Sequence, residues 1–513
     1  MGCGGLQTTQ PRASSLRILG GPAWWIDSRR RTAQTHRMFT AALASRLRFI
    51  SKLAISNLSL LCLATLPAHA AAPPLHPVVE TETEVYTYRP ADNGAGPLWC
   101  AGSTCLVRLG DRVFASGLET LADVKPLNNC RWLLFALEGD TWQQVLADPN
   151  GKTREPSPLT GFPDGRLFLS ANPTLVPGQY NGPARPEIFE FQAADAHAAP
   201  KRIVPEWNGA PKFTEHSYRS FAADGARSEL VLFQNIDYTH AEWTFRDRGG
   251  AGAAKGELRW PWGADYAKPE PIRVCYPNVA LQNRAVHFCG VSDIIEPKPE
   301  WRAFKKELTG REWDYDFRRL FYTWTPDITR EGFKPWVEIA SREATCGWIM
   351  PGDLWLGPDG RVHLVWSERA LDERLRARFF PQAKQSQAIN YAVVRDGAVV
   401  LRRTLAIAEE GGSREIPSSP RFQPTPDGRL FMVFYVSGAD ASGKAVSENR
   451  VLEVGPDGAV GKAVALPLQK PFSQFFTATV RAGSAPSETL DMLGQPAGGG
   501  AVIRYARVRL LGR

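Results

Sequence analysis

The chain has 513 residues, 43% of them hydrophobic and 22% charged, and a formal net charge of +8. Residues 1–70 hold nine of the 61 Lys and Arg residues but only one of the 53 Asp and Glu residues, so the remainder of the chain is electrically balanced. A balanced chain has no global field that attracts polyanions. This excludes a general nucleic-acid-binding function and leaves any anion binding to local sites.

The first predicted element is a leader. From Met38, a basic segment precedes the apolar run LAISNLSLLCLATL and the sequence Pro-Ala-His-Ala at 67–70. This order is typical of a cleaved signal peptide rather than a membrane anchor. We therefore expect residues 1–70 to be the leader and 71–513 a secreted or periplasmic protein without a stable membrane span. The residues before Met38 fit either a long basic start of this leader or a start codon placed too early.

Six cysteines follow the leader: Cys100, Cys105, Cys130, Cys275, Cys289 and Cys346. An even number in an exported protein favours disulfides. Cys275 and Cys289 lie seven residues either side of Gln282, the centre of a predicted hairpin, so they are predicted to face each other and form a bridge. No cluster of Cys and His has the spacing of a zinc site, and we expect no metal or cofactor.

A short hairpin motif recurs through the exported part of the chain. It reads PDGRLFLS at 163–170, PDGRVHLVW at 358–366 and PDGRLFMVF at 426–434, with weaker copies at 109–117, 223–233 and 281–290. Each copy is a tight turn followed by an apolar, β-branched run, which predicts two adjacent strands. Repeats of this length that carry several strands are typical of a β-propeller, with insertions lengthening some of them.

Counting the turns predicts six blades, and the chain ends predict a seventh. The six lie at about 100–148, 156–207, 214–262, 272–340, 346–408 and 417–468. The seventh combines FFTATVRA, TLDMLGQ and AVIRYARVRLL from the C-terminal end with residues 82–90, which leaves no open sheet edge. The sequence thus predicts an all-β, seven-bladed propeller forming a single domain over 71–513, with six or eight blades as alternatives, and a monomer.

The connections between the second and third strands are predicted to lie on one face of the propeller. The long stretches 234–243, 290–317 and 367–386 fall there, and long ordered insertions on one rim usually build a site. The apolar spacing at 310–321 and at 368–380 predicts a short helix in each of the last two stretches. The turns of the recurring hairpin lie on the opposite face.

One column of residues is predicted to line the central channel at the face with the insertions. It consists of Thr104, Pro158, Tyr218, Tyr276, Asp353 and Arg421, each six residues before a turn centre. If these positions only packed the core, we would expect Val, Leu or Ala there. The polar and aromatic residues found instead indicate a functional site. The alternative is that these groups bind ordered water in the channel.

Histidines and tryptophans supply further candidates. His216 precedes Tyr218 by two residues and points to the same side, either as an acid or base or as a cap of the strand start. His240, with Glu242, lies on the rim, whereas the repeat places His287 and His363 where other copies have Phe168 and Phe431, which predicts packing between blades. Trp301, Trp313 and Trp348 are predicted either to stack on sugars or to pack between blades.

The sequence GDTW at 139–142 resembles the end of the Asp-box motif of BNR-repeat propellers, which are related to sialidases. It falls before the last strand of the first blade, where that motif is expected. The resemblance covers the exported chain as an architecture and implies a ring of blades with a site at its centre. No catalytic residue of that family can be assigned to a position in this chain.

These observations lead to two hypotheses about function. The first is an exported glycoside hydrolase or polysaccharide lyase acting on an acidic glycan, with Arg421 holding a carboxylate and His240 and Trp348 binding substrate. Proton transfer would fall to His216 with Tyr218 or Tyr276, and hydrolysis would use the carboxylate pair Asp353 and Glu368. The second hypothesis is a non-catalytic propeller that binds a glycan or a protein at the same face.

Overall fold

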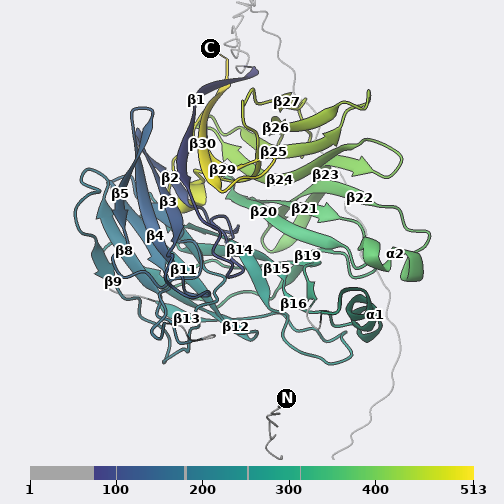
Figure 1. The fold of residues 1–513 in the computed structure, drawn as a ribbon, viewed down its shortest axis with the longest axis horizontal. Coiled ribbons are helices and arrows are strands. Elements are labelled where there is room, and N and C mark those ends of the chain that lie inside the picture. The colour runs from purple at the N-terminus through teal and green to yellow at the C-terminus, as the bar shows by residue number, and fades with distance from the viewer. Residues whose placement is uncertain are drawn as a thin grey trace, which may run out of the picture. The chain divides into compact units, whose positions relative to one another are not determined.

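The computed structural model describes residues 74–99, 101–177, 179, 182–250, 254–311 and 314–512. The predicted signal peptide, Cys100 and Trp313 lie outside the described residues. The described chain folds into seven four-stranded antiparallel sheets and one two-stranded sheet (Figure 1). The predicted all-β, seven-bladed propeller is therefore confirmed.

The first three blades follow one another along the chain. They are β2 (Leu106–Leu109), β3 (Arg112–Thr120), β4 (Cys130–Glu138) and β5 (Thr141–Ala147); β6 (Leu159–Gly161), β7 (Arg166–Ala171), β8 (Glu187–Gln192) and β9 (Lys201–Ile203); and β10 (Ser220–Asp224), β11 (Glu229–Ile236), β12 (His240–Arg246) and β13 (Lys255–Arg259).

Of the next three blades, the fourth and the fifth each carry one helix between their strands. The three blades are β14 (Val274–Gln282), β15 (Ala285–Ser292), β18 (Arg319–Thr325) and β19 (Val337–Ser341); β20 (Trp348–Leu356), β21 (Val362–Arg369), β22 (Ser386–Arg395) and β23 (Ala398–Glu409); and β24 (Glu415–Pro424), β25 (Leu430–Ala439), β26 (Ala445–Val454) and β27 (Val464–Ala465). The pair β16 (Ile294–Ile295) and β17 (Tyr315–Asp316) forms the small extra sheet.

The seventh blade joins the two ends of the chain, as predicted. It consists of β28 (Phe472–Thr477), β29 (Thr489–Pro496), β30 (Val502–Leu511) and, as its outermost strand, β1 (Leu75–Thr87). β1 runs antiparallel to β30 over its whole length. This pairing supplies the hydrogen bonds that an open edge of the seventh blade would leave unmade.

The first strand of each blade lies on the channel axis, and neighbouring first strands contact one another around the ring from β2 through β28 and back to β2. The apolar core is divided among the interfaces between blades. In one of them, Phe162 and Phe168 of β6–β7 pack with Phe221 and Leu232 of β10–β11. Each blade is therefore stabilised by its two neighbours, which is typical of repeat architectures.

The recurring turn has a simple cause in the Asp side chain. The carboxylates of Asp164 and Asp359 each accept a hydrogen bond of 3.1 Å from the backbone N–H two residues later, which closes an Asx-type turn. Gly165 follows in the left-handed region, with φ 90°, where glycine is favoured. Gly139 and Asp140 of the GDTW sequence form the turn between β4 and β5, and Trp142 of β5 packs on Tyr505 across the blade interface.

The helices differ in part from the prediction. α2 (Glu373–Phe379) lies within the predicted stretch 368–380, but the other helix, α1 (Pro299–Thr309), precedes the predicted stretch 310–321. Gly310 ends α1 in the left-handed conformation, and the chain then becomes extended in β17. Trp301 of α1 is buried beside Leu375 of α2, so this ring packs between the two helices and does not offer a platform for a sugar.

Two further expectations are wrong. Cys275 and Cys289 are free, buried thiols, because the hairpin turns at Asn283 and Arg284 instead of Gln282. This register pairs Cys289 with Asn278, and Cys275 lies opposite Val291. The stretch 234–243 is not a long insertion, since it is mostly strand, and the connection from β11 to β12 spans only residues 237–239. Among the described residues, no helix is long and apolar enough to cross a membrane.

Packing between blades was predicted for His287 and His363, but the ring contacts of each are with side chains of its own blade. His363 is bonded through Nδ1 to the Tyr391 hydroxyl at 2.6 Å and lies against Trp355, while His287 is bonded to the Tyr322 hydroxyl at 2.7 Å. Burial lowers the pKa of each imidazole to about 4, so both are neutral in the folded protein near pH 7.

Replacing His363 by Phe, the residue at the same place in two other blades, should weaken the acid sensitivity of the fold. The imidazole pKa is lower in the folded than in the unfolded chain, so its contribution is complete above about pH 6.5 and is lost as the pH falls toward about 4. We expect the stability difference between about pH 7 and about pH 4 to shrink by about 2–3 kcal/mol. Urea unfolding at both pH values measures this, and an unchanged difference would contradict it.

The ring closure also depends on an ion pair between blades seven and one. Arg108 of β2 donates two hydrogen bonds of 2.5 Å to Asp491 of β29, which is 1% exposed and also accepts one from the Tyr505 hydroxyl. Asp491→Asn should lower the free energy of unfolding by about 3 kcal/mol, because it leaves a half-buried guanidinium without its anion. Denaturant unfolding measures the loss.

The matched control is Glu453→Gln, which breaks the more exposed pair of Glu453 with Arg429. This change should cost less than about 1 kcal/mol, because solvent screens the pair. Equal losses in the two variants would show that the contact between Arg108 and Asp491 does not hold the first and last blades together.

Candidate functional site

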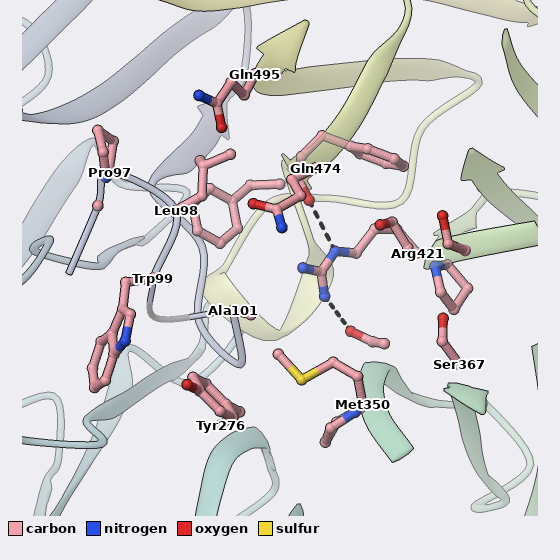
Figure 2. A pocket seen from close by; sticks show the side chains of 18 of the residues that line it. Pro97, Leu98, Trp99, Ala101, Tyr276, Met350, Ser367, Arg421, Gln474 and Gln495 are labelled. Atoms are coloured by element: carbon pink, nitrogen blue, oxygen red, sulfur yellow. Dashed lines mark hydrogen bonds between the residues drawn. The ribbon is translucent and has the colours of Figure 1, made fainter. Parts of the chain in front are cut away.

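A cavity of about 400 Å³ opens at the channel mouth, on the face where the inner strands begin (Figure 2). Blades four to seven supply one part of its wall, and the segment that follows β1 supplies the rest. The aromatic residues lining it are Tyr88, Trp99, Tyr276, Trp348, Phe475 and Phe476. Polar groups include Ser367, Ser418, Gln474 and Gln495, and one charged side chain, Arg421, lines the cavity.

Irregular backbone at the start of four consecutive inner strands shapes this cavity. The register shifts in β14, β20, β24 and β28, in each strand within a few residues of its mouth end. Pro277, Pro351 and Pro420 lie at three of these shifts, where a missing N–H interrupts the ladder. Tyr276 and Ser419 have φ 48° and 53°, so the bulges hold two lining residues in a strained conformation.

Arg421 is the central polar group of the cavity. Its side chain donates from Nε to the Phe475 carbonyl at 3.1 Å and from Nη1 to the Gly352 carbonyl, and these bonds fix the guanidinium between blades. Nη2 has no hydrogen bond to the described residues and lies on the open side of the cavity (Figure 2). No carboxylate of the described chain lies within ion-pair distance of it.

Arg421 is 9% exposed, and this burial is the main influence on the pKa of its guanidinium. Desolvation lowers the pKa of the guanidinium to about 10; the charge of Asp353 opposes this effect and that of Arg481 adds to it. The group is therefore still protonated near pH 7. A buried cation without a paired anion is unfavourable, and an anion entering the cavity would relieve this cost.

The segment between β1 and β2 covers one side of the channel mouth. It places Trp99 in stacking contact with Tyr218, at 5.0 Å between ring centres, and beside His216 at 5.2 Å and Tyr276 at 5.7 Å. The two tyrosines of the predicted channel column and the separately predicted His216 therefore do come together, but around Trp99. Of these three, Tyr276 lines the cavity, whereas Tyr218 is 7% exposed and lies behind the Trp99 ring.

His216 and the nominated carboxylates have other partners. His216 Nδ1 lies 2.9 Å from Glu155, Glu368 pairs with Arg342 and accepts from Trp366, and none of these side chains lines the cavity. Asp353 is bonded to Arg481 at 2.8 Å and to two backbone N–H groups, so its oxygens point away from the cavity. His240, on the outer strand β12, lies away from the cavity, whereas Trp348 lines it.

The channel is closed on the opposite face. The 3₁₀ turn η1 (Val480–Ala482), between β28 and β29, contacts the inner strands β6, β10, β14 and β20. Arg481 of this turn pairs with Asp353 and donates to the Gly102 carbonyl at 2.6 Å. A side chain at Gly483 would overlap the Gly161 carbonyl oxygen, so glycine lets the turn enter the ring. Ligands therefore reach the cavity from the mouth face alone.

Several residues of the site lie outside the channel column used for prediction. Trp99 and Gln474 belong to segments without the recurring turn, and Arg481 follows the seventh inner strand. Arg481 could have been expected from its partner Asp353, because a carboxylate on the wall of the predicted channel requires a cation nearby.

No family model matches the chain, and no curated protein matches it in sequence. Solved structures with a related fold include a Dyadobacter fermentans protein of unknown function (10% identity, TM-score 0.41, covering 85% of this chain and 99% of that one). A Penicillium chrysogenum α-L-arabinanase has 12% identity and a TM-score of 0.39, and the match covers 84% of this chain and 98% of that one. A Fusarium graminearum α-L-arabinofuranosidase has 13% identity and a TM-score of 0.38, with the same coverages.

Replacing Arg481 by Met tests whether the ion pair closes the channel. The change keeps an unbranched apolar stem but removes the guanidinium, so the Asp353 carboxylate, which is 2% exposed, loses its cation. We expect a loss of about 3 kcal/mol in unfolding free energy. The exposed Arg402→Met on β23 is the control and should stay within about 0.5 kcal/mol of the parent. A small loss for both would mean that backbone N–H groups suffice for Asp353.

Proposed function

We propose that the protein is an exported, carbohydrate-active propeller that binds an acidic sugar at the mouth of its channel. The observation that carries this proposal is Arg421, a buried cation without an anionic partner in the described chain, at the wall of an aromatic cavity. A uronate or another carboxylated sugar offers the missing anion. Its carboxylate can accept from the free side of a guanidinium that is already fixed in place.

The rest of the lining suits a sugar ring. Trp99, Tyr276 and Trp348 offer apolar faces that can stack on the C–H face of a pyranose, while Gln474 and Gln495 offer amide groups to its hydroxyls. The volume of about 400 Å³ lies within the range typical of small-molecule sites. The strained backbone at Tyr276 is also a common feature of ligand sites.

The lining residues favour elimination over hydrolysis as the chemistry of this site. Glycoside hydrolysis normally uses two carboxylates, and no Asp or Glu of the described chain lines the cavity. In elimination, a base removes the proton beside the sugar carboxylate, an unsaturated sugar forms, and the leaving oxygen takes up a proton. Arg421 would stabilise the charge that develops on the carboxylate, and Tyr276 is the predicted proton-transfer group that lines the cavity.

Non-catalytic binding is the second candidate. It is supported by the position of His216 and Tyr218 behind Trp99, which leaves the cavity without an imidazole from the described chain. Incubating the protein with uronic-acid polymers and following the ultraviolet absorbance of unsaturated products separates the two candidates, since only elimination generates that absorbance.

Arg421→Met should weaken binding of an acidic oligosaccharide by about 10- to 100-fold, because a charged hydrogen bond contributes about 1.5–3 kcal/mol. Binding of a neutral oligosaccharide of the same length should change little. Isothermal titration calorimetry with a uronate oligomer and its carboxyl-reduced form measures both.

The control is Arg402→Met, an exposed arginine that lies outside the cavity. It should bind the acidic oligomer like the parent protein, and circular dichroism should show that all variants are folded. Equal affinity of the parent protein for the acidic and the reduced oligomer would refute a carboxylate site at Arg421.

A further inference from the structure

Three metal-ligating side chains come together on the outer strands of the third blade. His240 and Glu242 are two residues apart on β12 and point to the same side, and Glu257 of β13 is directly opposite Glu242 in the register. One ligand atom from each lies within 4.8 Å of the other two. Two carboxylates in directly opposed positions repel each other unless a cation lies between them.

The hydrogen bonds around His240 leave one of its nitrogens as an acceptor. The Thr239 hydroxyl donates to the Ile236 carbonyl at 3.1 Å, so its oxygen accepts from His240 Nδ1–H at 2.7 Å. In the neutral ring, Nε2 then carries a lone pair, and it faces Oε1 of Glu242 at 3.3 Å. Two acceptors at this distance require a positive charge between or beside them.

Glu242 gives an independent indication of a missing cation. It is 5% exposed, and its Oε2 has no hydrogen-bond partner. Gln234, the neighbour opposite it on β11, donates from its amide to Asn172 at 3.2 Å, and no bond from it reaches Glu242 Oε2. The described ion pairs give Glu242 no Lys or Arg, whereas Arg259 binds Glu257 at 2.7 Å.

We propose that His240, Glu242 and Glu257 form a binding site for a divalent transition-metal ion of the Zn²⁺ type. One imidazole and two carboxylates are a ligand set that Zn²⁺ accepts, and the bond from Nδ1–H to Thr239 is the outer contact that usually orients a ligating histidine. His240 is partly exposed and Glu257 is exposed, so a fourth position is open to water. The site lies apart from the Arg421 cavity and is independent of its function.

The test is equilibrium dialysis of the purified, chelator-treated protein against Zn²⁺, with metal content measured by mass spectrometry. We expect one Zn²⁺ per chain and a rise in melting temperature on binding. His240→Ala and Glu257→Gln should each weaken binding at least about tenfold, since even outer contacts of metal sites contribute that much. Absence of saturable binding to the parent protein would overturn the proposal.

Two control variants change a histidine and a glutamate of the neighbouring second blade. They are His197→Ala, at an exposed position, and Glu190→Gln on β8. Both should keep parent affinity, and equal weakening in them would overturn the assignment. Glu242→Gln separates a metal from a proton, because the amide imitates the protonated acid. It should abolish Zn²⁺ binding and raise the melting temperature of the metal-free protein. Zn²⁺ binding that survives this change would also overturn the proposal.

Discussion

The structure depends on one constraint, the closure of the ring by the pairing of β1 with β30. The first and last parts of the chain share a sheet, so the seventh blade has a fourth strand and the inner strands of all seven blades meet around one axis. Every feature of the candidate site follows from that convergence. Inner strands far apart in the chain bring Tyr276, Arg421 and Gln474 to one cavity, and the segment leaving β1 adds Trp99 to its wall beside Tyr276.

Two buried arginines near the axis show how the protein treats charge differently at its two faces. Arg481 enters from the turn side and is neutralised by Asp353, so it closes the channel as part of the structure. Arg421 is bound by two backbone carbonyls and has no carboxylate partner in the described chain, so its charge is left facing the cavity. An anion site requires a cation that is held in position but not neutralised. Such a buried, unpaired cation lowers the stability of the fold, whereas a structural arginine paired with a carboxylate does not.

Much of the architecture could be predicted because its signals are local. The Asp-Gly turn and the apolar run after it identify each inner hairpin without knowledge of the rest of the chain, and the repeat places His287 and His363 in packing positions. The prediction failed where a single residue changes the register. The hairpin turns at Asn283 and Arg284 instead of Gln282, which pairs Cys289 with Asn278, and Gly310 ends α1 before the stretch in which a helix was expected.

The sequence by itself therefore determined the seven blades, their order, the closing strand and the polar character of the channel, because turns and strand periodicity act over a few residues. Only the tertiary structure decided which channel residues face the cavity. Trp99 covers Tyr218 and His216, Arg481 satisfies Asp353, and β12 pairs with β13 so that Glu257 meets Glu242. These contacts join residues far apart in the chain or on separate strands, and their register depends on bulges and packing that no local pattern encodes.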